Sequence, residues 1–373
     1  MIRTLKKIGK ILLLVLFAVV GLFFTLILVF NIVRWRDISL QKQHLKDLRD
    51  LYSEDFVPID EQKFVGFDLE DNDLRLNEIR ILASHNSYKK KGTAIGKLFV
   101  GLGDSFAEAR ALEYGNPDLT TQLNVGIRSF ELDVRYRKDE FECTHVPLVD
   151  NSTTAAKLAL AFEEIALWSK NNPNHIPIIL LLELKSDWMM LDPLLEDIGS
   201  AELTLLDELI VASFSDSLYT PKELMGAYSS IRERLVAESW PLVNALLGKV
   251  IVVLHPGKFT SDYLELDPEF DDMAMFPAVS NQDIDHPHAA FSVHNNPDPE
   301  RILPLLEANM IVRTRMDSSL IPNEEVRALA RECGAQIMTT DFHPAHQFKN
   351  KEKVFLEAEY LIIRNDAWLD DDD

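Results

Sequence analysis

The sequence predicts an α/β protein, a parallel (β/α)8 barrel of the TIM type preceded by an N-terminal transmembrane helix. Short apolar runs typical of buried strands alternate with helical stretches, and about eight such runs favour a closed parallel barrel over an open sheet. The length of 373 residues allows one large domain of barrel size or two smaller domains. One apolar block near the N-terminus is long enough to cross a bilayer.

This N-terminal block, residues 11–33, predicts a transmembrane signal anchor. Thr25 and Asn31 are its clearly polar members, and a helix of this length spans the ~30 Å hydrocarbon layer. A cleaved signal peptide is the alternative, but the run exceeds the usual ~7–15-residue core and no small-x-small cleavage site follows it. Basic residues are more numerous before the block than after it, which predicts a cytoplasmic N-terminus at 1–10 and an extracytoplasmic domain.

Three further segments follow the anchor. Residues 34–76 are expected to form a stalk and a linker, because leucines recur at helical spacing over 40–51 and residues 57–78 are acidic and irregular. The barrel is expected over 77–350. Residues 351–373 form a C-terminal segment with an acidic tail.

Strands and helices are predicted to alternate through the barrel. The predicted strands are rich in β-favouring aliphatic residues, and the run that ends at Glu183 is apolar on both faces, as in a parallel sheet. These strands cover residues 79–84, 127–136, 140–146, 177–185, 250–254, 274–279, 289–293, 310–315 and 335–339. The main helices are predicted at 153–170, 192–213, 299–309 and 323–332, and a long connection with helical pieces at 89–118.

Charge and cysteine content exclude some classes of function. The whole chain carries −22 and residues 1–36 carry six basic and no acidic residues, so residues 37–373 carry −28. Such an acidic domain is not expected to bind nucleic acid, and it suits a setting with divalent cations. Cys143 and Cys333 are expected to be small buried side chains, and the sequence leaves open whether the fold pairs them.

Charged residues occur inside apolar runs, where an unpaired charge is costly. Glu131, Asp133 and Arg135 alternate along one predicted strand and therefore share a face. Glu183 and Lys185 share a face of another strand in the same way. An exposed edge strand with outward charges is the alternative, but the three leucines before Glu183 argue against exposure. These residues are therefore predicted to form one buried site.

Oxygen ligands and two imidazoles together suggest phosphodiester cleavage. The three carboxylates and the amide oxygen of Asn86 form a hard, oxygen-rich set suited to Ca²⁺, with Mg²⁺ as the second choice. His85 and His145 can act as a pair, one accepting a proton from a nucleophile and the other donating one to a leaving group. A cation beside them would stabilise negative charge on phosphate oxygens.

These motifs also resemble those of a known family. In chain order they are His85-Asn86-Ser87-Tyr88, Glu131-Leu132-Asp133, His145 and Glu183, followed by segments 218–221, 312–315 and 334–341. This order resembles that of the calcium-dependent phosphoinositide-specific phospholipases C, in particular the compact C1-like branch of the PLC-like phosphodiesterase superfamily. The resemblance covers about residues 77–345.

The resemblance implies a role for each site residue. His85 would bind the phosphate and stabilise the pentacovalent state, and His145 would protonate the leaving alkoxide. Glu183 is the candidate to help deprotonate the inositol 2-hydroxyl, whose attack on phosphorus gives a cyclic phosphate and diacylglycerol. The implied Ca²⁺ ligands are Asn86, Glu131, Asp133 and Glu183. The candidates for binding substrate are Lys185, Arg135, Arg313 and Arg315.

The implied substrate is phosphatidylinositol or a related phosphodiester, approached from a membrane that holds the N-terminal helix. A glycerophosphodiester phosphodiesterase is the alternative enzyme, because it shares the barrel, the histidine pair and the carboxylate site. That family usually carries His-Arg-Gly where this chain has His85-Asn86-Ser87, which favours the phospholipase. A non-catalytic lipid-headgroup or Ca²⁺-binding domain is a further alternative, and the complete histidine pair argues against it.

Overall fold

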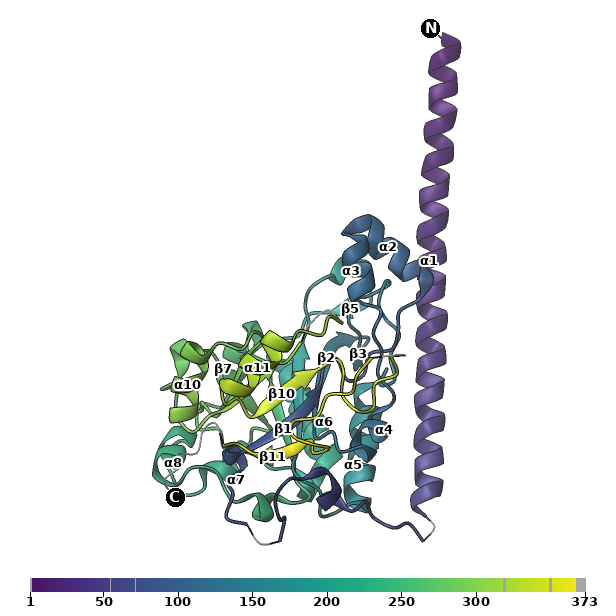
Figure 1. Ribbon diagram of the computed structural model, residues 1–373. Coiled ribbons are helices and arrows are strands. Elements are labelled where there is room, and N and C mark those ends of the chain that lie inside the picture. The colour runs from purple at the N-terminus through teal and green to yellow at the C-terminus, as the bar shows by residue number, and fades with distance from the viewer. Residues whose placement is uncertain (1, 54, 71, 318–319, 349–350, 367–373) are drawn as a thin grey trace.

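A long N-terminal helix stands beside an α/β barrel in the computed structural model (Figure 1). The structure describes residues 2–53, 55–70, 72–317, 320–348 and 351–366, so the end of the predicted acidic tail lies outside the described residues. Helix α1 covers Ile2–Tyr52 without interruption. The predicted transmembrane segment and the predicted stalk are therefore parts of one continuous helix.

Eight parallel strands close into a barrel within the described residues, which confirms the predicted fold. Their order around the ring is β1, β10, β9, β8, β7, β6, β4 and β2, and the pairing of β2 with β1 closes it. Each crossover connection, usually a helix, returns the chain to the start of the next strand, so neighbouring strands are parallel. The barrel strands are β1 Ile79–Ser84, β2 Ser129–Arg137, β4 Ile178–Leu184, β6 Val250–Leu254, β7 Met275–Val279, β8 Phe291–His294, β9 Ile311–Arg315 and β10 Ile337–Thr340.

Helices and short helical turns connect the strands. Helix α11 begins at the predicted place because the Asn323 side chain caps it, accepting hydrogen bonds from two backbone N–H groups of the first turn. The described helices after α1 are α2 Ala94–Gly103, α3 Phe106–Ala111, α4 Leu119–Asn124, α5 Leu158–Asn171, α6 Ser200–Phe214, α7 Pro221–Met225, α8 Ile231–Glu238, α9 Lys258–Leu264, α10 Pro299–Glu307 and α11 Glu324–Glu332.

Two helices begin later than predicted. Helix α5 starts at Leu158 instead of 153, because Thr153 and Thr154 use their hydroxyls to bind the carbonyl of Tyr88. Helix α6 starts at Ser200, after the short strand β5 Leu195–Glu196. The hydroxyl contacts before α5 and the pairing of β5 with β2 before α6 compete with the first turn that was predicted for each helix.

The predicted strand at 140–146 lies outside the barrel. Strand β3, Glu140–Cys143, pairs antiparallel with the outer end of β2. Lys138 and Asp139 form the two-residue turn, and both have positive φ angles, 51° and 60°, as in a type I′ hairpin. The chain thus runs out of the barrel along β2 and returns along β3, which brings the residues after β3 back to the barrel mouth.

The second half of α1 packs along the barrel. Leu45 and Leu48 are 1% and 5% exposed, because α1 lies against α5. Arg34 Nε donates to Glu142 Oε2 of β3 at 2.8 Å. The carboxylate of Asp37 is buried, lies 3.1 Å from Lys90 Nζ and accepts a backbone hydrogen bond at 3.0 Å. The segment predicted as a stalk is therefore part of the folded domain.

The last turns of the predicted transmembrane segment also touch the barrel. Leu26 and Phe30 are 2% and 5% exposed and form a cluster with Leu148, on the loop that follows β3. Two apolar residues of α2, Ile95 and Phe99, pack on the same cluster, and α2 lies beside α1 in Figure 1. The rest of α1 on its N-terminal side extends past the barrel.

Candidate active site

The three predicted carboxylates meet at the C-terminal ends of β2 and β4. The register of these strands pairs Asp133 with Glu183, and Glu131 lies two residues earlier on the same face of β2. One carboxylate oxygen from each residue lies within 4.8 Å of the others. The structure therefore brings together the three acidic residues predicted as metal ligands.

Asp133 is a buried acid without a hydrogen-bond donor. It is 1% exposed, and neither of its carboxylate oxygens has a hydrogen-bond partner among the described residues. Lys185 Nζ lies 3.6 Å from Asp133 and 2.5 Å from Glu183. Burial raises the pKa of Asp133 to about 6, although the charge of Lys185 lowers it. Buried carboxylate oxygens without hydrogen-bond donors, beside two further acids, can supply oxygen ligands to Ca²⁺, so the residues fit this ion.

Glu131 is ion-paired from across the barrel. Arg313 of β9 contacts its carboxylate, and the side chains of Asn295 and Thr339 hold the guanidinium in place. Burial would raise the pKa of Glu131, but Arg313 and neighbouring cations outweigh this effect and lower the pKa to about 2. Arg315 lies farther away, with its Nη2 4.0 Å from the same carboxylate.

The turn after β1 carries His85 and Asn86. His85 Nδ1 lies 2.9 Å from Oδ1 of Asp341, which follows β10. Asn86 is 4% exposed, has a positive φ of 43°, and its side-chain amide donates to the hydroxyl of Tyr114. The next residue, Ser87, exchanges two hydrogen bonds of 2.9 Å with the backbone of Glu131. This pair of bonds places the His85–Asn86 turn against the strand that carries the carboxylates.

His145 reaches the site through the β2–β3 hairpin. Thr144, just before it, donates its backbone N–H to the Asp133 carbonyl at 3.3 Å. His145 Nδ1 lies 2.9 Å from Asp150 Oδ2, and the fully buried Lys89 ammonium lies 3.3 Å from the other oxygen of Asp150. Both histidines thus have a carboxylate partner at Nδ1, which leaves Nε2 for chemistry.

Arg135 does not reach the carboxylate cluster in this arrangement. It is 1% exposed, and its guanidinium donates to the carbonyls of Thr144, His145 and Asp187 and to the Asp187 carboxylate. Arg135 therefore fixes the loop that carries His145. Asp341 ends the segment 334–341 that carries part of the family resemblance, although its pairing with His85 was not predicted, whereas Asp150 and Tyr114 gave no sequence signal.

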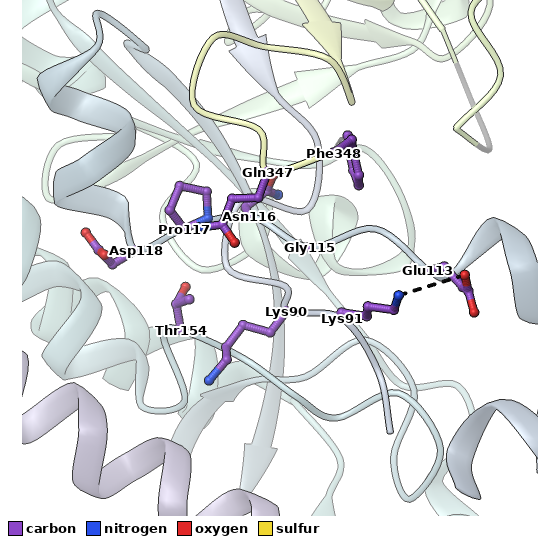
Figure 2. A pocket seen from close by; sticks show the side chains of 10 residues that line it. All are labelled: Lys90, Lys91, Glu113, Gly115, Asn116, Pro117, Asp118, Thr154, Gln347 and Phe348. Atoms are coloured by element: carbon purple, nitrogen blue, oxygen red, sulfur yellow. Dashed lines mark ion pairs between the residues drawn. The ribbon is translucent and has the colours of Figure 1, made fainter. Parts of the chain in front are cut away.

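Two hollows border these residues. One of about 850 Å³ lies at the C-terminal ends of β6, β7 and β8 and includes His294 and Asn295, the residue that holds Arg313. The other, about 650 Å³, lies behind the His85–Asn86 turn and is lined by Lys90, Lys91 and Asn116 among others (Figure 2). None of the three clustered carboxylates lines the second hollow, so it is separate from the barrel mouth.

Comparison with known proteins places the chain in a family. The family described as phosphoinositide phospholipase C, Ca²⁺-dependent, matches residues 74–140 and 135–365. None of the curated proteins compared matches the chain.

Solved structures share the barrel fold. A calcium-dependent phosphoinositol-specific phospholipase C from the Gram-negative bacterium Pseudomonas sp. aligns with a TM-score of 0.59 and 20% identity over 82% of this chain and 100% of its own. A Ca²⁺-dependent phosphatidylinositol-specific phospholipase C from Streptomyces antibioticus aligns with a TM-score of 0.51 and 19% identity over 72% of this chain and 94% of its own. Because the family match extends over most of the sequence, the chain belongs to the Ca²⁺-dependent phosphoinositide phospholipase C family, whose members are phosphodiesterases.

Proposed function

We propose that the chain is a membrane-anchored, Ca²⁺-dependent phosphodiesterase that cleaves phosphatidylinositol or a closely related phosphodiester. One observation carries the proposal: the buried Asp133 carboxylate has no hydrogen-bond donor within the described part of the chain and lies beside Glu131 and Glu183, at a mouth that also contains two carboxylate-paired histidines. The residues that would hold the ion are Asn86, Glu131, Asp133 and Glu183. Bound there, Ca²⁺ would neutralise phosphate charge and lower the pKa of a nearby hydroxyl.

We assign the two histidines different roles in the reaction. We assign His145, paired with Asp150, as the general acid that protonates the glycerol oxygen as its bond to phosphorus breaks. His85, paired with Asp341, would hydrogen-bond the phosphate and stabilise its charge in the transition state. Glu183 is the candidate base for the inositol 2-hydroxyl, whose attack on phosphorus yields a cyclic phosphate and diacylglycerol.

The basic residues differ in solvent exposure, and therefore in whether they can contact the phosphate of a substrate. Lys185 and Arg315 are 20% and 25% exposed and are the best-placed candidates for direct contact. Arg313 and Arg135 are buried, so we assign them to positioning Glu131 and the His145 loop, respectively.

The catalytic assignment is tested with full-length protein in mixed micelles of detergent and phosphatidylinositol. Chelation is expected to abolish turnover, and Ca²⁺ is expected to restore it better than Mg²⁺. His85→Ala and His145→Ala should each lower kcat by roughly 10²–10⁴-fold. A cyclic inositol phosphate among the products supports the phospholipase, whereas glycerol phosphate would indicate the glycerophosphodiesterase. Turnover that survives chelation would sink the metal assignment.

The N-terminal helix supports the membrane part of the proposal. Among the described helices, α1 is the one long and apolar enough to cross a membrane, a property that signal sequences share. Its side chains from Ile8 to Phe24 are largely exposed, with Leu14 68% and Phe17 65% exposed, which is unusual for a surface in water. The following turns pack on the barrel through Leu26 and Phe30, which favours a retained anchor over a removed signal sequence.

The same packing suggests how the barrel faces the bilayer. The turns of α1 at Leu26 and Phe30 contact α2, which follows the C-terminal end of β1, and the His145 loop, which follows the hairpin that extends β2 beyond the barrel. Exposed apolar side chains lie on the same side, including Leu102 on α2 and Met190 after β4, which are 66% and 85% exposed. We therefore place the barrel mouth against the bilayer that α1 enters, with the N-terminus cytoplasmic and the barrel extracytoplasmic, as the basic residues before the span predict.

A further inference from the structure

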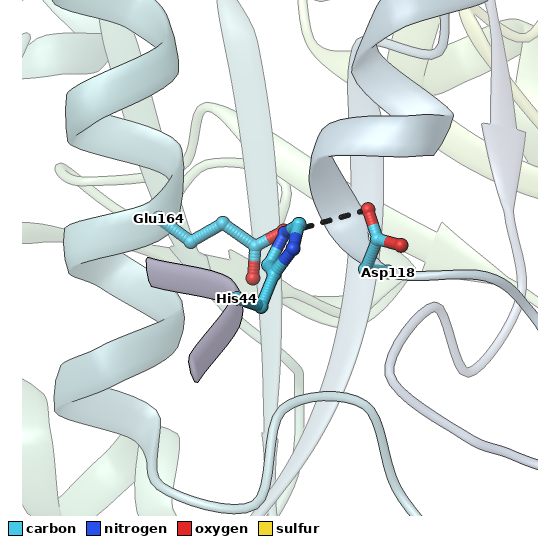
Figure 3. Close-up of side chains that lie close together, drawn as sticks. All are labelled: His44, Asp118 and Glu164. Atoms are coloured by element: carbon cyan, nitrogen blue, oxygen red, sulfur yellow. Dashed lines mark hydrogen bonds and ion pairs between the residues drawn. The ribbon is translucent and has the colours of Figure 1, made fainter. Parts of the chain in front are cut away.

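A second group of potential metal ligands lies where α1 packs on the barrel, and it shares no residue with the active site. His44 of α1, Asp118 at the start of α4 and Glu164 of α5 point toward one another (Figure 3). One ligand atom from each residue lies within 4.8 Å of the others. His44 Nε2 is 3.2 Å from Glu164 Oε1 and 3.6 Å from Asp118 Oδ1.

The charge in this cluster is not balanced by a permanent cation. Glu164 is completely buried, and its Oε2 atom has no hydrogen-bond partner among the residues that the structure describes. Within the part of the chain that the structure describes, His44 is the sole basic side chain within ion-pair distance of Glu164 or Asp118. With a neutral imidazole, two negative charges therefore remain, one of them fully desolvated, which is costly.

Other buried carboxylates at the same helix interface are neutralised by lysine or arginine side chains. Asp37 lies near Lys90, and Glu142 is paired with both Arg34 and Lys157. Each of these acids has a lysine or arginine as its partner. At the cluster around Glu164, a bound cation would therefore supply the positive charge that lysine or arginine supplies elsewhere along this interface.

The spacing fits a small tetrahedral ion. Zinc bonds of about 2.0–2.1 Å to nitrogen and oxygen place neighbouring ligand atoms roughly 3.3–3.4 Å apart. The distances from His44 Nε2 to the carboxylate oxygens of Glu164 and Asp118, 3.2 and 3.6 Å, lie on either side of this value. Both carboxylates are held in place, because Asp118 accepts from Thr121 N and Glu164 from Thr120 N, each at 2.7 Å. A hollow of about 320 Å³ lined by His44 and Asp118 leaves room for an ion and a water to enter.

We propose that His44, Asp118 and Glu164 bind one Zn²⁺ ion, with water in the fourth position, and that this ion fastens the anchor helix to the barrel. One imidazole and two carboxylates suit zinc, whereas Ca²⁺ takes six or more oxygen ligands. The protein thus has two cation sites with different preferences, one at the barrel mouth and one between α1, α4 and α5.

The proposal is tested by metal binding to the full-length protein in detergent, a measurement that needs no turnover. Ca²⁺ is present in excess to occupy the active site. Co²⁺ serves as a spectroscopic substitute for Zn²⁺. About one equivalent is expected to bind with the visible absorption of a tetrahedral site and to be displaced by Zn²⁺. His44→Gln and Glu164→Gln should lose this absorption. Glu163→Gln is the matched control, because it removes the neighbouring acid on α5, which pairs with Arg49 instead.

Thermal unfolding gives an independent measurement. Zn²⁺ should raise the Tm of the wild type, of Glu163→Gln and of the active-site variant Asp133→Asn, but not of His44→Gln. Absence of a tetrahedral Co²⁺ spectrum in the wild type would overturn the proposal, even if a variant failed to fold. Equal Co²⁺ binding by the wild type and His44→Gln would also overturn it and leave His44 as an ion-pair partner.

Discussion

Two aspartates set the orientation of the two histidines at the barrel mouth. Asp341 lies 2.9 Å from His85 Nδ1, and Asp150 lies 2.9 Å from His145 Nδ1. A carboxylate at Nδ1 holds the proton on that nitrogen, orients the ring and stabilises the imidazolium form. Lys89 keeps Asp150 in place from the other side. We therefore expect both aspartates to act as positioning residues.

Replacing Asp150 tests this role. Asp150→Asn should lower kcat by roughly 10²-fold or more, because an amide partner favours the wrong tautomer of His145. KM should change little. The double variant with His145→Ala should be no slower than His145→Ala alone. Additive losses would show that Asp150 acts independently of His145.

Asp207 on α6 is a buried acid to which we assign no part in the reaction. It is 8% exposed and accepts hydrogen bonds from the Tyr263 hydroxyl at 2.7 and 2.8 Å and from Ala274 N at 3.3 Å. Burial raises the pKa of Asp207 to about 7, although these hydrogen bonds lower it. The folded state therefore retains a proton that the unfolded chain releases near its ordinary pKa of ~3.9.

This raised pKa predicts a loss of stability as the pH rises. Between about pH 4 and 7 the folded state binds more protons, so the free energy of unfolding should fall by up to ~1.4 kcal/mol per pH unit. Asp207→Asn should remove this contribution. The difference in free energy of unfolding between wild type and variant, measured with urea across this range, cancels the effects of other groups. A difference that does not vary with pH would contradict the raised pKa.

Local sequence patterns predicted which carboxylates lie close together, but they did not predict partners that are distant in the sequence. Glu131 and Asp133 were found because strand alternation places them on one face, and Glu183 because it ends an apolar run. The partner of His85 is 256 residues away in the sequence, so no local pattern links the two. The burial of Arg313 could not be predicted either, because its ion pair with Glu131 forms across the closed barrel.

At the scale of elements, the β2–β3 hairpin is the feature that completes the site. Its apolar residues resemble those of a barrel strand, so the sequence pattern predicted another strand in the alternation. The two-residue turn at Lys138 and Asp139 was the signal that distinguished a hairpin, but lysine at the first turn position obscured it. The hairpin matters for function because it returns the chain so that His145 lies beside the carboxylates.

The hairpin turn gives a stability prediction. Lys138→Asn combined with Asp139→Gly should raise Tm by roughly 2–4 °C, because both positions have positive φ and Asn-Gly adopts this turn with less strain. The rate on soluble substrate should stay unchanged. Lys170→Asn, in the last turn of α5, is the control and should not raise Tm. A lower Tm in the double variant would show that the Lys138 and Asp139 side chains stabilise the hairpin.

At the scale of the whole molecule, α1 is both a transmembrane candidate and a structural part of the barrel. The sequence predicted the apolar span and the helical leucines after it, but it could not show that these leucines face α5 or that Leu26 and Phe30 face the His145 loop. Apolar periodicity identifies a buried face without identifying its partner. Because the helix is packed and not a free tether, its insertion would fix the height and orientation of the barrel mouth.

This orientation predicts which surface residues touch lipid. Leu102→Asp and Met190→Asp should each lower kcat/KM on phosphatidylinositol in vesicles by on the order of tenfold, since burying such a side chain contributes ~1.5–3 kcal/mol. Activity on a monomeric short-chain substrate should stay the same. Val236→Asp on α8 is the control, because Val236 is also 73% exposed but α8 lies at the other end of the barrel from α2 (Figure 1). Equal losses in all three variants, or no loss in the first two, would place the mouth away from the bilayer.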